Sequence, residues 1–122
     1  MARILVADDA SFMRQMIREI VEAEEFEVVG EASDGIEAVE EFKRLHPDII
    51  TMDIVMPRRS GIDAVRSIIE LDPGACIVMC SALGQETLVT EAIQAGARDF
   101  IVKPFKPESV LSTLTKVLGR DC

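Results

Sequence analysis

The sequence has 122 residues, of which 48% are hydrophobic and 29% charged, so it can form a globular domain with a core of its own. Its net charge of -9 and its lack of Trp and Tyr argue against a general binder of nucleic acid or of anionic membranes. No apolar run is long enough to cross a membrane, and no signal-peptide cleavage site follows the apolar N-terminus, so we expect a cytoplasmic protein.

Short apolar runs alternate along the chain with stretches whose apolar residues recur at the helical spacing. In chain order, the expected strands are residues 3–7, 26–32, 48–53, 76–80 and 99–102. A helix is expected after each strand, with apolar stripes that start at Phe12, Ile36, Ile62, Leu88 and Val110. This alternation requires a parallel sheet with helices on both faces, so we predict one α/β doubly wound domain over residues 1–122.

Several residues mark where the expected helices begin and end. Asp34 followed by Glu37 has the form of an N-cap with a reciprocating acid, so a helix begins there. Gly96 fits the residue that ends the fourth helix, and Pro107 fits the first turn of the last. In the first helix, Phe12, Met16 and Ile20, with the neighbouring Met13, Ile17 and Val21, follow the helical period.

The three cysteines form no Cys-x-x-Cys pair, and their number is odd. Cys76 and Cys80 lie in one expected strand at a separation of about 13 Å, too far for a disulfide between them. We interpret these two as core residues and Cys122 as a terminal thiol, rather than as metal ligands or redox groups.

Polar side chains follow four of the five expected strands, and in an open parallel sheet these strand ends form the ligand-binding edge. They are Asp8 and Asp9, Asp53, Ser81, and Lys103. Three carboxylates at one edge repel each other unless one is protonated or a cation lies among them. Oxygen ligands without a nearby His or Cys favour Mg²⁺, and a lysine and a hydroxyl beside it suit a phosphoryl group. A carboxylate can itself be the nucleophile that accepts this group.

Each of these residues has a simpler explanation when taken alone. Asp8 and Asp9 could cap the first helix, Ser81 could be a turn residue, and Lys103 could be a surface charge. Their conjunction at four strand ends favours a functional site.

The same residues lie in stretches that resemble response-regulator receiver domains, most closely the stand-alone chemotaxis regulators of the CheY type. The matching stretches are residues 4–14, 51–57, 80–82 and 95–105, and the resemblance runs from end to end. It implies a flavodoxin-like (βα)5 fold with a five-stranded sheet of order 2-1-3-4-5. Because CheY is itself a standard example of this order, the order is carried over from the family.

The resemblance implies that Asp53 accepts a phosphoryl group from a phosphohistidine of a sensor histidine kinase, with Mg²⁺ as cofactor. Asp9, Asp53 and the backbone carbonyl of Val55 would ligate the Mg²⁺, and Asp8 would help through water. Such a domain is no enzyme, since it catalyses only its own phosphorylation and dephosphorylation.

The resemblance also implies roles for the residues after the last two strands. Lys103 would pair with the phosphoryl oxygens, and a cis peptide bond is expected between Lys103 and Pro104. Ser81 matches the Ser/Thr switch and Phe100 the aromatic switch, which is often Tyr in the family. Phosphorylation of Asp53 would draw Ser81 inward, and Phe100 would fill the vacated space. This change would alter the surface of the fourth helix, fifth strand and fifth helix, where the family binds targets.

Val55 and Leu83 lie two positions after the acceptor and the switch residue, where polar side chains can orient the hydrolytic water. Both are apolar here. We therefore expect a fairly long-lived aspartyl phosphate.

The expected partners are a histidine kinase of the chemotaxis type, the flagellar motor switch protein and, where one exists, a dedicated phosphatase. We expect a monomer that binds no nucleic acid and inserts into no membrane. One alternative is a phosphorelay intermediate or a regulator of a non-motility output. Another is a degenerate, phosphorylation-independent receiver, against which the complete site argues. A third is a phosphatase of the haloacid-dehalogenase type, which needs a second Asp where this chain has Val55.

Overall fold

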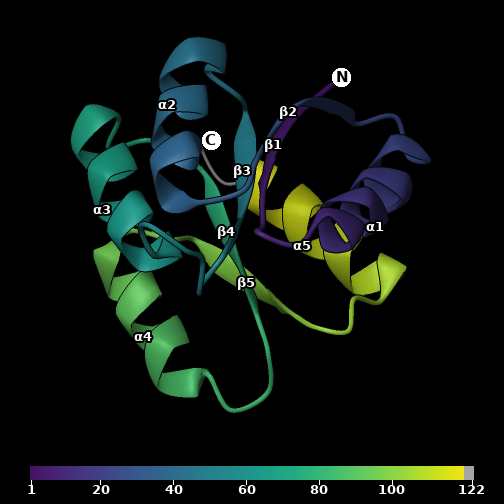
Figure 1. Ribbon diagram of the computed structural model, residues 1–122. Helices are drawn as coiled ribbons and strands as arrows, with labels where there is room; N and C mark the ends of the chain where they lie inside the picture. Colours follow the sequence, from purple (N-terminus) through teal and green to yellow (C-terminus); the bar gives the residue numbers. More distant parts are fainter. Residues whose placement is uncertain (120–122) are drawn as a thin grey trace.

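The computed structural model describes residues 1–119 and consists of one sheet with helices on both faces (Figure 1). The strands are β1 (Arg3–Ala7), β2 (Glu27–Ala32), β3 (Ile49–Asp53), β4 (Ile77–Ser81) and β5 (Asp99–Val102). The helices are α1 (Ser11–Glu22), α2 (Gly35–Leu45), α3 (Gly61–Leu71), α4 (Glu86–Ala95) and α5 (Pro107–Leu118). The five predicted strand–helix units are therefore confirmed.

The sheet has the order β2-β1-β3-β4-β5, and every neighbouring pair is parallel. This is the flavodoxin-like order that the resemblance implied. Helices α1 and α5 cover one face, and α2, α3 and α4 cover the other (Figure 1). The chain moves outward from β1 to β2 and then returns to the other side of β1, so the strand order reverses between β1 and β3. A ligand crevice is expected beyond the carboxyl ends of these two strands.

Each face of the sheet has a hydrophobic core of its own, because alternate side chains of a strand point to opposite faces. Every residue of β3 and β4 is buried, as expected for central strands. Ile50 and Met52 of β3 pack on the side of α2, α3 and α4, whereas Ile49 packs on the side of α1 and α5. These cores fix the strand ends rigidly relative to one another.

Helix α1 buries only part of its apolar sequence. Ile17 and Val21, which are four residues apart, pack against the sheet. Phe12 and Met16 have the same spacing but lie on a different side of the helix, and Phe12 is 68% exposed. The helical period was correct, but it did not distinguish the buried row of residues from the exposed one.

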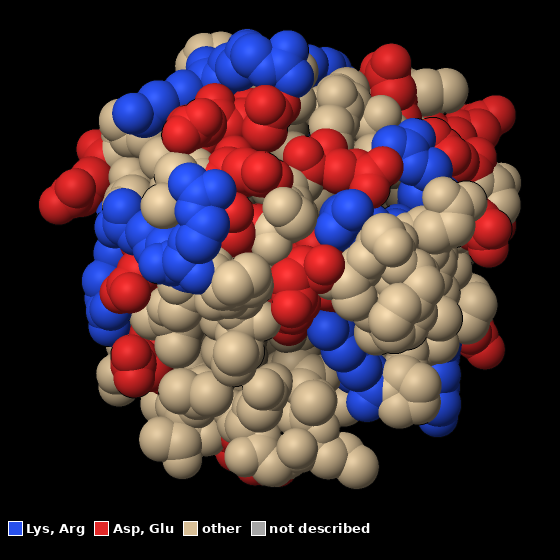
Figure 2. Space-filling model, viewed as in Figure 1, with Lys and Arg blue, Asp and Glu red and all other residues tan. Residues whose placement is uncertain are grey.

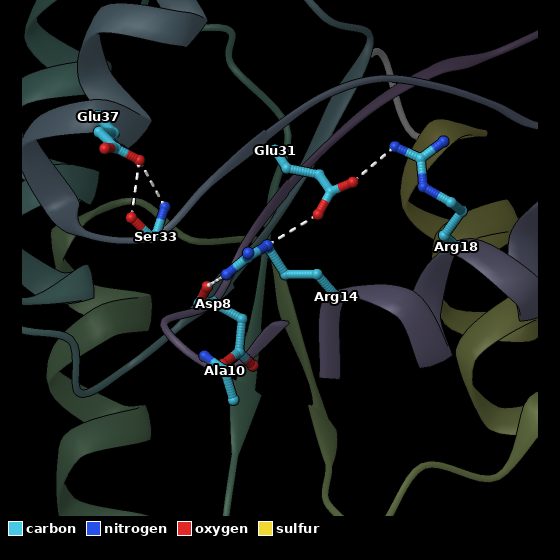
Figure 3. Close-up of polar contacts among 7 residues, drawn as sticks. All are labelled: Asp8, Ala10, Arg14, Arg18, Glu31, Ser33 and Glu37. Carbon is cyan, nitrogen blue, oxygen red and sulfur yellow. Dashed lines mark hydrogen bonds and ion pairs between the residues drawn. The ribbon is translucent and has the colours of Figure 1, made fainter. Parts of the chain in front are cut away.

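The first turn of α2 differs in one detail from the predicted capping box. Asp34 accepts a hydrogen bond from the Glu37 N–H at 2.8 Å, as predicted. Oε1 of Glu37, however, accepts from both the N–H and the hydroxyl of Ser33, one residue before the cap (Figure 3). The second carboxylate oxygen of Asp34 instead pairs with Arg58 at 3.2 Å. Helix α2 therefore begins where predicted, but the carboxylate of Glu37 bonds to Ser33 instead of to the cap residue Asp34.

Cys76 and Cys80 are both buried in the core, and Cys80 is a free thiol, so the predicted lack of a bond between these two is confirmed. The interpretation of Cys122 concerns a residue outside the described part of the chain. Within residues 1–119, no helix is long and apolar enough to cross a membrane.

Candidate functional site

Three carboxylates meet beyond the carboxyl ends of two adjacent strands. Asp8 and Asp9 follow β1, and Asp53 is the last residue of β3. Strand pairing places Ala7 beside Met52, so the two strands end together. One oxygen of each of the three carboxylates lies within 4.8 Å of the others. The topology therefore brings the three predicted acids together, with Asp8 and Asp53 buried and Asp9 exposed.

Lys103 brings a positive charge to this cluster from the end of β5. Its Nζ atom lies 3.0 Å from Oδ2 of Asp8 and 3.3 Å from Oδ1 of Asp53. Its backbone N–H donates to the carbonyl of Ser81 at 2.7 Å, which ties the ends of β4 and β5 together. The peptide bond between Lys103 and Pro104 is cis, as predicted.

The electrostatics of the cluster favour an added cation. Burial, and then the negative charge of Asp8, raise the pKa of Asp53 to about 6, although Lys103 opposes the shift. Burial also disfavours the charged form of Lys103, but its contacts with Asp8 and Asp53 outweigh this effect and raise its pKa. Lys103 thus stays an ammonium ion, and one ammonium faces three carboxylates.

The donor set suits a hard divalent cation. The three side chains offer only oxygen, which Mg²⁺ and Ca²⁺ prefer. Val55 lies in the loop just after β3, and its carbonyl accepts no hydrogen bond among residues 1–119, so this oxygen is available as well. The residues present therefore could hold a metal ion.

Ser81 lies at the end of β4, where its carbonyl accepts from the N–H of Lys103, and it shares a surface hollow with Phe100. Ser81 is the buried last residue of β4, and Phe100 is on β5 with 42% of its surface exposed. Both line a hollow of about 300 Å³, together with Leu83 and Val89. Leu83 is 84% exposed, and Figure 2 shows uncharged side chains over α4 and the loop that leads into it. An open apolar hollow therefore adjoins the site.

Sequence reasoning missed three residues that hold the site in place. A Cβ atom on Gly61 would lie 1.9 Å from the carbonyl oxygen of Asp53, so the backbone of the β3–α3 loop returns onto β3. The only sequence signal was a glycine at the start of the next helix. Arg14 and Glu31 form an ion pair next to Asp8, and no spacing rule pointed to it.

Comparison with known proteins shows the family to which the chain is similar. Residues 4–115 match the response regulator receiver domain family. The chain is 56% identical to chemotaxis protein CheY of Thermotoga maritima, over 94% of this chain and 96% of that protein. It is 51% identical to protein CcdB of Bacillus subtilis, over 98% of this chain and 99% of that protein.

A solved structure of the CheX–CheY–BeF3–Mg²⁺ complex from Borrelia burgdorferi contains a similar chain. Its TM-score is 0.91 at 38% identity, and the match covers 95% of this chain and 88% of that one. Such receiver domains are signalling domains rather than classical enzymes. The matching family, the fold and the acidic cluster agree, and the chain belongs to the response regulator receiver domain family.

Proposed function

We propose that this protein is a phosphorylation-dependent response regulator in which Asp53 accepts a phosphoryl group. The observation that carries the proposal is the position of Lys103, whose Nζ atom contacts both Asp8 and Asp53 at the edge where three carboxylates meet. A buried carboxylate with a cation beside it can hold a phosphoryl group with little reorganisation.

The proposed reaction is an in-line displacement at phosphorus. An oxygen of ionised Asp53 forms a bond to phosphorus while the bond from phosphorus to the imidazole nitrogen of the kinase breaks. The electron pair of that bond stays on the imidazole, which takes a proton from solvent. Positioning and charge neutralisation account for most of the catalysis of such a transfer. Here Lys103 would move its contact from Asp53 to the phosphoryl oxygens while it keeps Asp8.

We further propose that Asp9, Asp53 and the carbonyl of Val55 hold Mg²⁺, with Asp8 acting through water. When bound, the ion would neutralise charge that the phosphoryl oxygens bring to an already acidic site. The solved complex of the Borrelia relative contains Mg²⁺ and BeF3, which supports this assignment.

Ser81 and Phe100 would then transmit phosphorylation to the surface. Ser81 would donate its hydroxyl to the new phosphoryl oxygens, and Phe100 would move into the hollow that both residues line. Phe100 lacks the hydroxyl that Tyr would offer, so its burial alone would favour the switched state. The altered surface would comprise α4, β5 and α5.

The proposed partners are a chemotaxis histidine kinase and the flagellar motor switch protein, because relatives named CheY share more than half of the sequence. CcdB, a relative whose name does not refer to chemotaxis, is almost as similar at 51% identity, so a non-motility output is the second candidate. The phosphatase alternative lacks support, since the chain belongs to the receiver family and Val55 occupies the position of the required acid.

Incubation with acetyl phosphate and Mg²⁺, followed by intact-mass measurement, tests the acceptor. Wild type should gain one phosphoryl group, and Asp53→Asn should gain none. Asp63→Asn is the matched control, because Asp63 is exposed on α3 and should leave the modification unchanged. A phosphorylated Asp53→Asn variant would refute the assignment.

Binding assays with the purified candidate targets then distinguish the outputs. Tighter binding of the phosphorylated form to the motor switch protein would support chemotaxis. Equal binding of both forms would refute that output.

A further inference from the structure

Asp8 is held at each of its polar groups. Its N–H donates to the carbonyl of Ala32 at 2.9 Å. One carboxylate oxygen, Oδ1, accepts from the N–H of Ala10 at 2.9 Å, and the other, Oδ2, accepts from Lys103 at 3.0 Å. Its carbonyl oxygen accepts from Nη1 of Arg14 at 2.7 Å, as Figure 3 shows.

The contact with Arg14 differs from the others, because this carbonyl belongs to the peptide bond between Asp8 and Asp9. A peptide unit is planar, so a bond to its oxygen restrains the orientation of the whole unit and the position of the next Cα atom. The side chain of Asp9 is exposed and makes no hydrogen bond or ion pair within residues 1–119. Its direction therefore depends on the backbone that Arg14 restrains.

Arg14 is in turn oriented by Glu31 of the edge strand β2. Nε of Arg14 lies 2.7 Å from Oε1 of Glu31, and Nη2 of Arg18 lies 2.7 Å from Oε2. The hydrogen bond from Arg18 is the main cause of a lowered pKa of Glu31, with a further contribution from Arg14. Glu31 thus stays ionised between two guanidinium groups, of which only that of Arg14 reaches Asp8 (Figure 3).

We infer that Arg14 is a positioning residue that orients the Asp8–Asp9 pair for cation binding, with Glu31 directing its guanidinium group. The inference rests on the proposed function, since it assumes that these acids bind Mg²⁺. Residues that orient metal ligands typically change metal affinity by about 10- to 100-fold when they are replaced.

The sign of the effect separates this role from simple electrostatics. Loss of a positive charge near an acidic cluster should strengthen the binding of a divalent cation, because one repulsion disappears. Loss of a positioning contact should weaken it. A weaker affinity in Arg14→Ala would therefore oppose the Coulombic expectation.

The test is a titration of unphosphorylated protein with Mg²⁺ by isothermal calorimetry. The chain contains no Trp or Tyr, so amide NMR shifts of Asp8 and Asp9 provide the second readout. Arg14→Ala should bind Mg²⁺ about tenfold more weakly than wild type and should shift the Asp9 amide signal even without metal.

Arg18→Ala is the matched control, because Arg18 is one turn further along α1 and also binds Glu31 but does not contact Asp8. Its affinity should stay within about twofold of wild type. Arg14→Lys keeps the charge but cannot contact both Glu31 and the Asp8 carbonyl, so it should also bind Mg²⁺ more weakly. This variant replaces Arg14→Ala in the test if Arg14→Ala does not fold.

Equal affinities of wild type and both Arg14 variants would overturn the inference, and so would an equal loss in Arg18→Ala. In those cases wild type still binds Mg²⁺, and the proposed function stands. If wild type itself binds no Mg²⁺, the metal site of the proposed function fails and this inference fails with it.

Discussion

The Nζ atom of Lys103 lies 3.3 Å from Oδ1 of Asp53, although the two residues are 50 positions apart in the sequence with two helices between them. The same nitrogen lies closer still to Asp8. One ammonium therefore links the end of β5 to the ends of β1 and β3. Because this contact joins the proposed acceptor to its counter-charge, its removal gives the first prediction.

Lys103→Met should reduce the rate of phosphorylation by acetyl phosphate by about 10²- to 10³-fold, the usual cost of losing one preorganised charge donor. The same change should strengthen Mg²⁺ binding, because the ammonium no longer competes for the carboxylates. Intact mass over time and calorimetry measure the two effects. Lys43→Met, an exposed change on α2, is the control and should alter neither. A loss of both phosphorylation and Mg²⁺ binding would contradict this prediction and would indicate that the substitution disrupts the whole site.

Sequence reasoning located the acids and the lysine because topology alone decides where parallel strands end. Asp53 and Lys103 each follow an apolar run, and the repeat of strand and helix is sufficient to place those ends at one edge. The contact of Arg14 with the Asp8 carbonyl depends on a side-chain direction and on the path of a loop, and neither follows from periodicity. The exposure of Phe12 was missed for a related reason. Two sets of apolar residues on different sides of α1 have the same helical spacing, and the spacing does not tell which set is buried.

The raised pKa of Asp53 predicts how stability depends on pH without metal. Its folded pKa of about 6 exceeds the unfolded value of 3.8, so the folded state binds more protons between these values. The contribution of Asp53 to the free energy of unfolding is therefore fully present below about pH 4 and is lost as the pH rises through 6. By pH 7.5, Asp53→Asn should be more stable than wild type by about 2 kcal/mol, after allowance for solvent screening.

Urea unfolding followed by far-UV circular dichroism, in the presence of a chelator, measures this difference. The difference in unfolding free energy between Asp53→Asn and wild type should become smaller as the pH falls to 4, because wild-type Asp53 then becomes neutral. Saturating Mg²⁺ should also narrow it at pH 7.5 through binding to the folded wild type. A gap that is constant from pH 4 to 8 would contradict the prediction.

Gly61→Ala should destabilise the fold, because the new Cβ atom would lie 1.9 Å from the carbonyl oxygen of Asp53. Backbone must shift to relieve this contact, at a cost of roughly 1–3 kcal/mol in unfolding free energy. The shift should also slow phosphorylation, since it displaces the end of β3. Gly74→Ala is the matched control, because its nearest neighbour would be an Asp72 side-chain oxygen at 3.4 Å. Equal stabilities of the two variants would refute the role given to Gly61.

The lifetime of the phosphoryl group should depend on Val55. This side chain is 57% exposed, so replacement by a polar residue should not disturb the fold. An amide at this position can orient the attacking water, so Val55→Asn should hydrolyse its aspartyl phosphate on the order of tenfold faster, below the 10²–10⁴ typical of a full general base. Decay followed by intact mass after removal of acetyl phosphate measures the rate. Leu83→Ala, which adds no polar group, should decay as wild type does; identical decay in Val55→Asn would refute the prediction.

Phe100 should move into the hollow beside Ser81 when the site is occupied. Phe100 is 42% exposed and otherwise packed, so in the unmodified protein Phe100→Ala should destabilise the fold by roughly 1–2 kcal/mol, less than the loss of a fully buried Phe. With Mg²⁺ and beryllofluoride, a tetrahedral stand-in for the phosphoryl group, new NOEs should appear between the Phe100 ring and Ser81. Ser81→Ala removes the hydroxyl that would be drawn inward, so in this variant the NOEs from the Phe100 ring to the Cβ protons of position 81 should be much weaker. NOEs of full strength in Ser81→Ala would show that Phe100 moves independently of Ser81, contrary to the proposed switch.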